Sequence, residues 1–420
     1  MKEIKPIDMS KIPHRPNALF RFLIPTISFV LTCTRKIKIK KINCENLKGP
    51  YIVICSHASF MDFPLCAKVC YPEYPNYICS IEEFVGREWL MRNAGAYPKR
   101  KYTKDIGMVK NTLTTLKKEN NSIVIYPEAR YSFIGINEQI DQSIGKMVKK
   151  AGVPLVLLIT YGDFIYQPQW NKQPTKNNPH EVIFECIVTK EEVETMTADE
   201  IQERINEKFV FDEYRWQLEN KIKVKSKYRA HNIHRVLYKC PHCGKDYSMR
   251  SKHTKLWCEE CGVVYEMNEY GQLECMNREA KFTHAPDWYK WEREEVEKEV
   301  NCGKYSFKDT VRLEHLDNAQ IGFRYLGDVE FVHDMDGIHL HGQLDNGEEF
   351  IFNNHALNTP SIHIDYDFKK RGTKKRGQAI DINTQNDTWF IYPNTSDAVV
   401  TKIHFATEAL YNYHKNKKEM

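Results

Sequence analysis

A histidine and an aspartate separated by four residues are the first candidates for chemistry. They are His57 and Asp62, in the segment Cys-Ser-His-Ala-Ser-Phe-Met-Asp at 55–62. Histidine suits a general base that takes a proton from a hydroxyl group, because its unperturbed pKa lies near about 6.5. A carboxylate can hold the imidazole tautomer and stabilise the imidazolium that forms. The pair predicts attack of a hydroxyl on a carbonyl, and the alternative is a helix cap beside a loop histidine.

Four cysteines form a second candidate site. Two Cys-x2-Cys pairs, fourteen residues apart, are formed by Cys240, Cys243, Cys258 and Cys261. A glycine follows each pair, at Gly244 and Gly262, and permits a tight turn. Four thiolates match the tetrahedral coordination of zinc, with iron as the main competitor. Because cysteines fill all four positions, we expect the Zn²⁺ to be structural and the segment to resemble a zinc ribbon.

The elements around His57 must position it. Three short apolar runs predict buried strands at 51–55, 122–126 and 153–159. Helical patterns lie between them at 106–119 and 144–151. Strands separated by helices indicate an α/β fold, with a layered sheet and flanking helices. His57 follows the first predicted strand, and a strand-to-helix junction there can bring Asp62 back to the imidazole.

Three further segments follow the His57 segment in a fixed order. They are Asn-Ala-Gly-Ala-Tyr-Pro-Lys-Arg-Lys at 93–101, Ile-Tyr-Pro-Glu-Ala-Arg-Tyr-Ser at 125–132, and Ala-Gly-Val-Pro-Leu-Val at 151–156. The four segments resemble the lysophosphatidate and glycerol-3-phosphate acyltransferase family. That family has His-x4-Asp, Gly-Ala-Phe-Pro-like, Phe-Pro-Glu-Gly-Thr-Arg and Val-Pro motifs. The resemblance covers roughly residues 45–165.

The resemblance implies an O-acyltransferase of the 1-acylglycerol-3-phosphate type. A fatty acyl group would move from a thioester, acyl-CoA or acyl carrier protein, to a hydroxyl of a glycerol-phosphate-type lipid acceptor. His57 would be the general base and Asp62 its orienting partner. Glu128 would position the acceptor or the backbone of its own motif, and Arg130 would bind phosphate. The cationic surface for the acceptor phosphate would comprise Lys99, Arg100 and Lys101.

One motif departs from the family pattern. The chain has Glu128-Ala-Arg130 where the family has Glu-Gly-Thr-Arg, so one residue is missing and the Gly-Thr pair is absent. One alternative function is therefore acyl transfer to a different acceptor, such as a sugar, an aminolipid or another lipid alcohol. A second alternative is a zinc-ribbon binding protein on a degenerate acyltransferase scaffold. Glu128 and Arg130 could also form a local salt bridge at a strand end.

The N-terminal part predicts contact with a membrane surface. The apolar stretch 22–33 is shorter than the roughly 20 residues that a spanning helix needs, and it lacks the features of a signal peptide. Basic residues at 35–41 could contact anionic lipid. The 13 cysteines, an odd number, argue for a reducing setting. We expect a peripheral or monotopic protein on the cytoplasmic side, with no spanning helix.

Composition and pattern divide the chain into parts. At 41% apolar and 28% charged residues, the chain is globular, and its net charge of +5 indicates no particular partner. The predicted parts are a membrane-associating segment at 1–48, an acyltransferase domain at 49–220, a linker at 221–238, a zinc ribbon at 239–265 and a β-rich module at 286–420. We expect the ribbon to be structural or a docking module, and we expect no nucleic-acid partner. The basic loop 369–376 could contact lipid.

Overall fold

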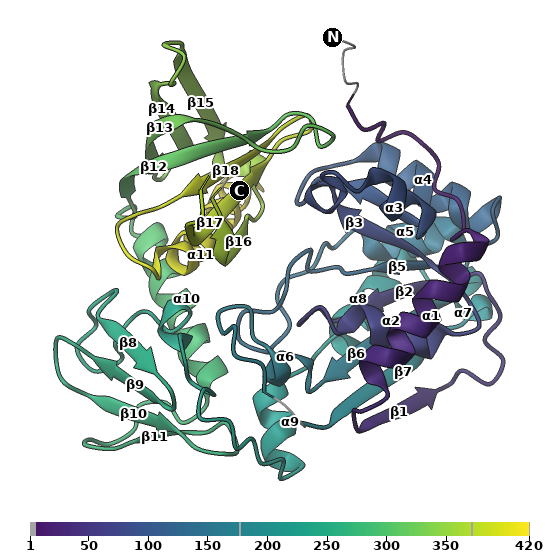
Figure 1. Cartoon of the computed structure of the whole chain (residues 1–420), viewed down its shortest axis with the longest axis horizontal. Coiled ribbons are helices and arrows are strands. Elements are labelled where there is room, and N and C mark those ends of the chain that lie inside the picture. The colour runs from purple at the N-terminus through teal and green to yellow at the C-terminus, as the bar shows by residue number, and fades with distance from the viewer. Residues whose placement is uncertain (1–5, 176–177, 371–372, 420) are drawn as a thin grey trace.

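A seven-stranded sheet organises the first half of the chain (Figure 1). The computed structural model describes residues 6–175, 178–370 and 373–419. The strand order is β1-β7-β6-β2-β5-β3-β4. Their bounds are β1 Ile37–Ile42, β2 Ile52–Cys55, β3 Asn76–Ser80, β4 Ala96–Lys99, β5 Ile123–Ile125, β6 Leu155–Tyr161 and β7 His180–Val188. The strands β6, β2, β5, β3 and β4 run parallel, and β7 is antiparallel to β6.

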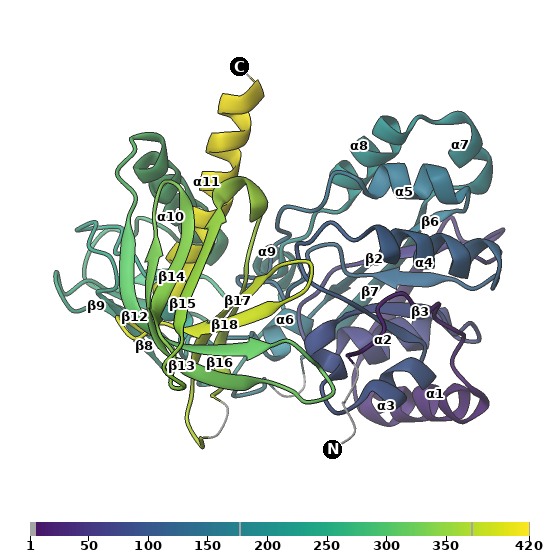
Figure 2. The same cartoon turned by 90° about the horizontal axis from the view of Figure 1, so that it is seen from above.

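Helices cover both faces of this sheet, as Figure 2 shows. One face packs against α4 Ile106–Lys117, α5 Ile144–Ala151 and α8 Ala198–Lys208. The other face packs against α2 Asp62–Cys70, with α1 Ala18–Thr32 outside it. All four residues of β2 are buried, which explains their continuous apolar sequence. Shorter helices are α3 Glu88–Asn93, α6 Asp163–Tyr166, α7 Lys190–Thr195, α9 Glu213–Glu219 and the 3-10 helix η1 Ile81–Phe84.

The second half contains two antiparallel sheets joined by a long helix. The smaller sheet consists of β8 Met249–Lys252, β9 Lys255–Cys258, β10 Val264–Met267 and β11 Leu273–Cys275. Of the four predicted metal ligands, Cys258 ends β9, and the other three lie in loops beside the sheet. Helix α10, Ala285–Asn301, leads to the larger sheet (Figure 1). Its strands are β12 Phe307–Leu316, β13 Arg324–His333, β14 Gly337–Gln343, β15 Glu349–His355, β16 His363–Lys369, β17 Arg376–Asn383 and β18 Thr388–Tyr392. Helix α11, Val399–Glu419, closes the chain and packs on α10 and β16.

The predicted fold class is confirmed: an α/β sheet with flanking helices precedes a cysteine cluster and a β-rich region. Residues 197–220 contain two helices, α8 and α9, and Phe209 and Phe211 between them turn into the core. Residues 37–42, which we assigned to the N-terminal segment, form β1 and pair with β7. The predicted linker contains the 3-10 helix η2, Ile233–Arg235, and buried apolar residues that join the core of the second half.

Three predicted segments reach beyond the described residues. These are the N-terminal segment 1–48 at residues 1–5, the β-rich module 286–420 at residues 371–372 and 420, and the basic loop 369–376 within that module at residues 371–372. The predicted acyltransferase domain 49–220 includes two more such residues, 176–177. Among the described helices, none combines the length and the hydropathy that crossing a membrane requires.

Candidate active site

The predicted site residues gather beyond the carboxyl ends of the parallel strands. His57 follows β2, Lys99 ends β4, and Glu128 and Arg130 follow β5. In open α/β sheets, ligands bind in the crevice outside this edge of the sheet. The parallel order of the strands therefore brings together motifs that are far apart in the sequence.

His57 and Asp62 form a hydrogen-bonded pair, with 2.8 Å between His57 Nδ1 and Asp62 Oδ2. The same carboxylate oxygen accepts hydrogen bonds from the backbone N–H groups of Ala58 at 2.7 Å and Ser59 at 3.1 Å. The hydroxyl of Thr160 on β6 donates to Asp62 Oδ1 at 3.2 Å. The Asp62 side chain is 1% exposed, so these bonds hold it in one orientation. With Nδ1–H donating to Asp62, His57 Nε2 is the nitrogen that can accept a proton.

Two tyrosines hold the imidazole ring of His57. The ring centroids of Tyr126 and Tyr131 each lie 4.1 Å from that of His57. The backbone N–H of Ser132 donates to the carbonyl oxygen of His57 at 2.7 Å, which ties the loop after β5 to the loop after β2. The His57 side chain is 22% exposed, so it combines a fixed ring with access for a reactant.

A second histidine–aspartate pair, which is buried, lies close to Asp62. His180 on β7 bonds Asp163 through Nδ1 at 2.5 Å, and its Nε2 lies 3.2 Å from the Arg35 guanidinium. Burial and the neighbouring Asp62 raise the pKa of Asp163 well above its ordinary range. Burial, followed by the charge of Arg35, lowers the pKa of His180 to about 4. The sequence analysis missed both this pair and Thr160, since none of these residues lies in a recognisable motif.

Glu128 supports the backbone of its loop. It is buried, and its Oε1 accepts the backbone N–H of Glu138 at 2.7 Å. Burial raises the pKa of Glu128 to about 8. The next residue, Ala129, has a φ of 54°. This left-handed conformation favours glycine, which the resembling family has at the position after its glutamate.

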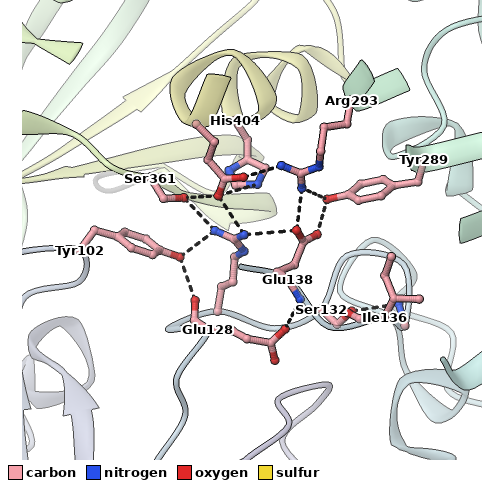
Figure 3. Close-up of polar contacts among 12 residues, drawn as sticks. Tyr102, Glu128, Ser132, Ile136, Glu138, Tyr289, Arg293, Ser361 and His404 are labelled. Atoms are coloured by element: carbon pink, nitrogen blue, oxygen red, sulfur yellow. Dashed lines mark hydrogen bonds and ion pairs between the residues drawn. The ribbon is translucent and has the colours of Figure 1, made fainter. Parts of the chain in front are cut away.

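Arg130 is enclosed by polar groups from several elements, among them Tyr102, Glu138 and Ser361, which Figure 3 labels. Its guanidinium lies 3.1 Å from Glu408 Oε1 and 3.5 Å from Glu138 Oε2. It also donates to the hydroxyls of Tyr102 at 3.1 Å and Ser361 at 2.9 Å. The Arg130 side chain is 1% exposed. In this structure its charge is therefore balanced by carboxylates of the chain itself.

Two of the three other predicted cations contact the C-terminal sheet. Arg100 donates to the Thr388 hydroxyl at 2.6 Å, and Lys101 lies 2.8 Å from Asp381 Oδ2. Both partners belong to the larger antiparallel sheet, Asp381 on β17 and Thr388 on β18. Lys99 is half-buried, and burial lowers its pKa. The structure thus brings the predicted cations to one edge of the first sheet, where the larger antiparallel sheet meets Arg100 and Lys101.

The four cysteines of the smaller sheet converge. Their sulfur atoms lie within 4.8 Å of one another, with 3.6 Å between Cys240 and Cys261 and 3.8 Å between Cys243 and Cys258. Four sulfurs placed about 2.3 Å from one ion at the corners of a tetrahedron are about 3.8 Å apart, so the donor set fits tetrahedral zinc. His242 bonds the hydroxyl of Tyr265 at 2.9 Å.

A family model matches the part of the chain that holds these motifs. Residues 34–159 match the family model described as Acyltransferase. A solved structure, the 1-acyl-sn-glycerophosphate (LPA) acyltransferase PlsC from Thermotoga maritima, is similar at 16% identity and a TM-score of 0.33, over 45% of this chain and 78% of that one. The sequence has no match among curated proteins. Residues 34–159, which hold the predicted catalytic and substrate-binding residues, are therefore similar to the acyltransferase family.

Proposed function

We propose that this chain is an O-acyltransferase that moves a fatty acyl group from a thioester to the hydroxyl of a lipid-type acceptor. The observation that carries the proposal is the buried Asp62 carboxylate, which orients His57 at the carboxyl edge of the sheet. The family match over residues 34–159 supports the reaction type. The thioester is acyl-CoA or an acylated carrier protein.

His57 acts as the general base in this reaction. Its Nε2 takes the proton of the acceptor hydroxyl while the hydroxyl oxygen attacks the thioester carbonyl carbon. The carbon–sulfur bond then breaks, and the imidazolium returns the proton to the leaving thiolate. Asp62, held by Ala58, Ser59 and Thr160, stabilises the imidazolium between these two steps.

We propose that α1 and α3 contact the membrane from which the acceptor comes. Large apolar side chains on α1 are more than half exposed: Leu19, Phe22, Ile27, Phe29 and Val30. On α3, Trp89 is 67% exposed, and its ring lies 6.1 Å from that of Phe20 on α1. The adjacent strand β1 carries exposed lysines at Lys38, Lys40 and Lys41. Exposed apolar groups beside cations suit a surface of anionic lipid.

We also propose that the four cysteines hold one structural zinc ion. Cys240 and Cys258 are buried and contribute to the core of the second half of the chain. Gly244 and Gly262 have φ values of 73° and 70°, which glycine adopts without strain. When bound, the ion would crosslink the two cysteine pairs, and it has no part in the proton transfer at His57.

The catalytic proposal is tested by replacing the base. His57→Ala should lower acyl transfer by about 10²- to 10⁴-fold, because the general base is lost. The assay follows release of the CoA thiol and formation of acylated lipid from acyl-CoA and a panel of single-chain lipids. His339→Ala, on the surface of the larger sheet, is the matched control and should keep wild-type rates. Near-wild-type acyl transfer by the His57→Ala variant would contradict the proposal.

A further inference from the structure

The larger antiparallel sheet and α11 supply the groups that meet the predicted phosphate-binding cations. Glu408 of α11 meets Arg130, Asp381 of β17 meets Lys101, and Thr388 of β18 meets Arg100. Each contact joins residues that lie more than 270 positions apart in the chain. These contacts determine how much positive charge on Arg130, Arg100 and Lys101 remains free to bind an acceptor.

The Arg130 contact forms a closed charge network (Figure 3). Glu408 and Glu138 also bind Arg293 of α10, at 2.5 Å and 2.6 Å. Two carboxylates therefore balance two guanidinium groups, and all four side chains are at most 17% exposed. Burial disfavours the charge of Glu408, but His404, Arg130 and Arg293 outweigh it and lower the pKa of this carboxyl. The network leaves no excess positive charge for a phosphate.

The Lys101 contact has an excess of carboxyl groups. Asp381 lies 2.8 Å and Glu82 3.7 Å from the Lys101 ammonium. Asp381 also pairs with His363 of β16 at 3.1 Å. Asp365, which also lies on β16, accepts a hydrogen bond from Gln169 at 3.0 Å. Burial opposes the charge of Lys101, but Asp381 and Glu82 outweigh it and raise its pKa. Burial raises the pKa of both Glu82 and Asp365.

Tyr131 follows β5, at the same edge of the first sheet as this cluster. Its ring packs on His57. Burial raises the pKa of Tyr131, and the charges of Asp62, Asp365 and Lys101 act on it as well. Lys101 follows β4 and His57 follows β2, so the carboxyl cluster and the base lie at the same edge of the first sheet.

We infer that the acceptor carries an uncharged, hydroxyl-bearing head group and no phosphate, and that Asp381 and Glu408 determine this specificity. A phosphate monoester carries a charge of about −1.5 to −2 at pH 7. It would have to displace a carboxylate from a buried ion pair, and breaking such a pair leaves an uncompensated charge. Carboxyl groups, in contrast, can exchange hydrogen bonds with hydroxyl groups. The inference rests on the proposed acyl transfer and specifies its acceptor class.

The first test compares two acceptors that differ only in the phosphate. The full chain receives acyl-CoA with either lysophosphatidate or the monoacylglycerol of the same acyl chain. We expect kcat/KM to be at least tenfold higher for the monoacylglycerol. A smaller ratio, or a preference for lysophosphatidate or for a single-chain amine tested in parallel, would overturn the inference. Absence of His57-dependent transfer to every acceptor would instead refute the proposed function.

The second test changes the specificity-determining carboxylate. Asp381→Asn removes the charge that balances Lys101, so the use of lysophosphatidate relative to monoacylglycerol should rise at least tenfold. Asp336→Asn, exposed between β13 and β14, is the matched control and should leave the ratio unchanged. Thermal unfolding reports whether each variant is folded. An unchanged ratio in folded Asp381→Asn contradicts the assignment to Asp381, and if that variant does not fold, the comparison of acceptors on the wild-type chain decides.

Discussion

Two buried carboxyl groups near the imidazole have opposite roles at the scale of single residues. Asp62 accepts three hydrogen bonds from His57 and two backbone N–H groups on one oxygen, and a fourth from Thr160 on the other. Glu128 accepts a hydrogen bond from the Glu138 backbone, and its Oε2 has no hydrogen-bond partner among the described residues. The different surroundings suit one group to stabilise a cation and the other to brace a loop.

Glu128 should make the protein less stable in alkaline solution. Its pKa rises from 4.5 to about 8 on burial, so the folded state retains a proton that the unfolded chain has lost. The free energy of unfolding should therefore fall as the pH rises from about 4.5 to about 8, by on the order of 1–4 kcal/mol. Glu128→Gln should lose this decline, as measured by urea unfolding at pH 5, 6.5 and 8. Glu297→Gln, exposed on α10, should keep it, and an equal decline in both variants would contradict the assignment.

At the scale of elements, α1 presents its apolar side chains to solvent. Its buried residues are Phe20, Ser28 and Thr32, of which two are polar, so the inward face of the helix is narrow. Lys68 on α2 donates to the Thr32 hydroxyl at 3.3 Å, which attaches α1 to the layer beneath it. An apolar helix face that the protein itself leaves exposed suits an environment other than water.

Phe22 and Phe29 should provide much of the membrane affinity. They are 67% and 65% exposed. The double change Phe22→Ser/Phe29→Ser removes two large apolar side chains and should weaken binding to vesicles containing phosphatidylglycerol at least tenfold. Cosedimentation measures the bound fraction. Ile351→Ser, which alters a 63% exposed residue on β15, is the control and should bind as wild type. Equal sedimentation of the double variant and the wild type would show that α1 is not the contact.

The elements with a strong local pattern could be predicted from the sequence. Continuous apolar runs indicate β2, β5 and β6, and apolar residues at helical spacing indicate α4 and α5. The structure has all five elements. Strand β1 could not be predicted, because its alternating lysines resemble a solvated segment and its partner β7 lies about 140 residues away. The pairing of Arg130 with Glu408 could not be predicted either, because the two residues lie 278 positions apart in the chain. Local patterns indicate elements, whereas these pairings depend on tertiary packing.

At the scale of the whole molecule, one apolar core connects the cysteine cluster to the first half of the chain. Residues from both halves and from α11 share it: Phe133, Phe164, Tyr238, Leu256, Phe331 and Phe405. Lys402 of α11 also pairs with Asp246, three residues after Cys243, at 2.6 Å. The cysteine cluster is therefore coupled to the helix that carries Glu408, which lies against Arg130.

Loss of the metal should consequently affect the molecule far from the cysteines. The purified chain should contain one zinc ion, and Cys243→Ser should lose it and lower the melting temperature by at least about 5 °C. Because α11 would be less firmly held, the ratio of kcat/KM for monoacylglycerol to kcat/KM for lysophosphatidate should fall in the same variant. Elemental analysis, thermal unfolding and the two-acceptor assay measure these three effects. Cys302→Ser, exposed after α10, should change none of them, whereas a metal-free Cys243→Ser protein that melts as wild type would show that the cluster does not stabilise the domain contact.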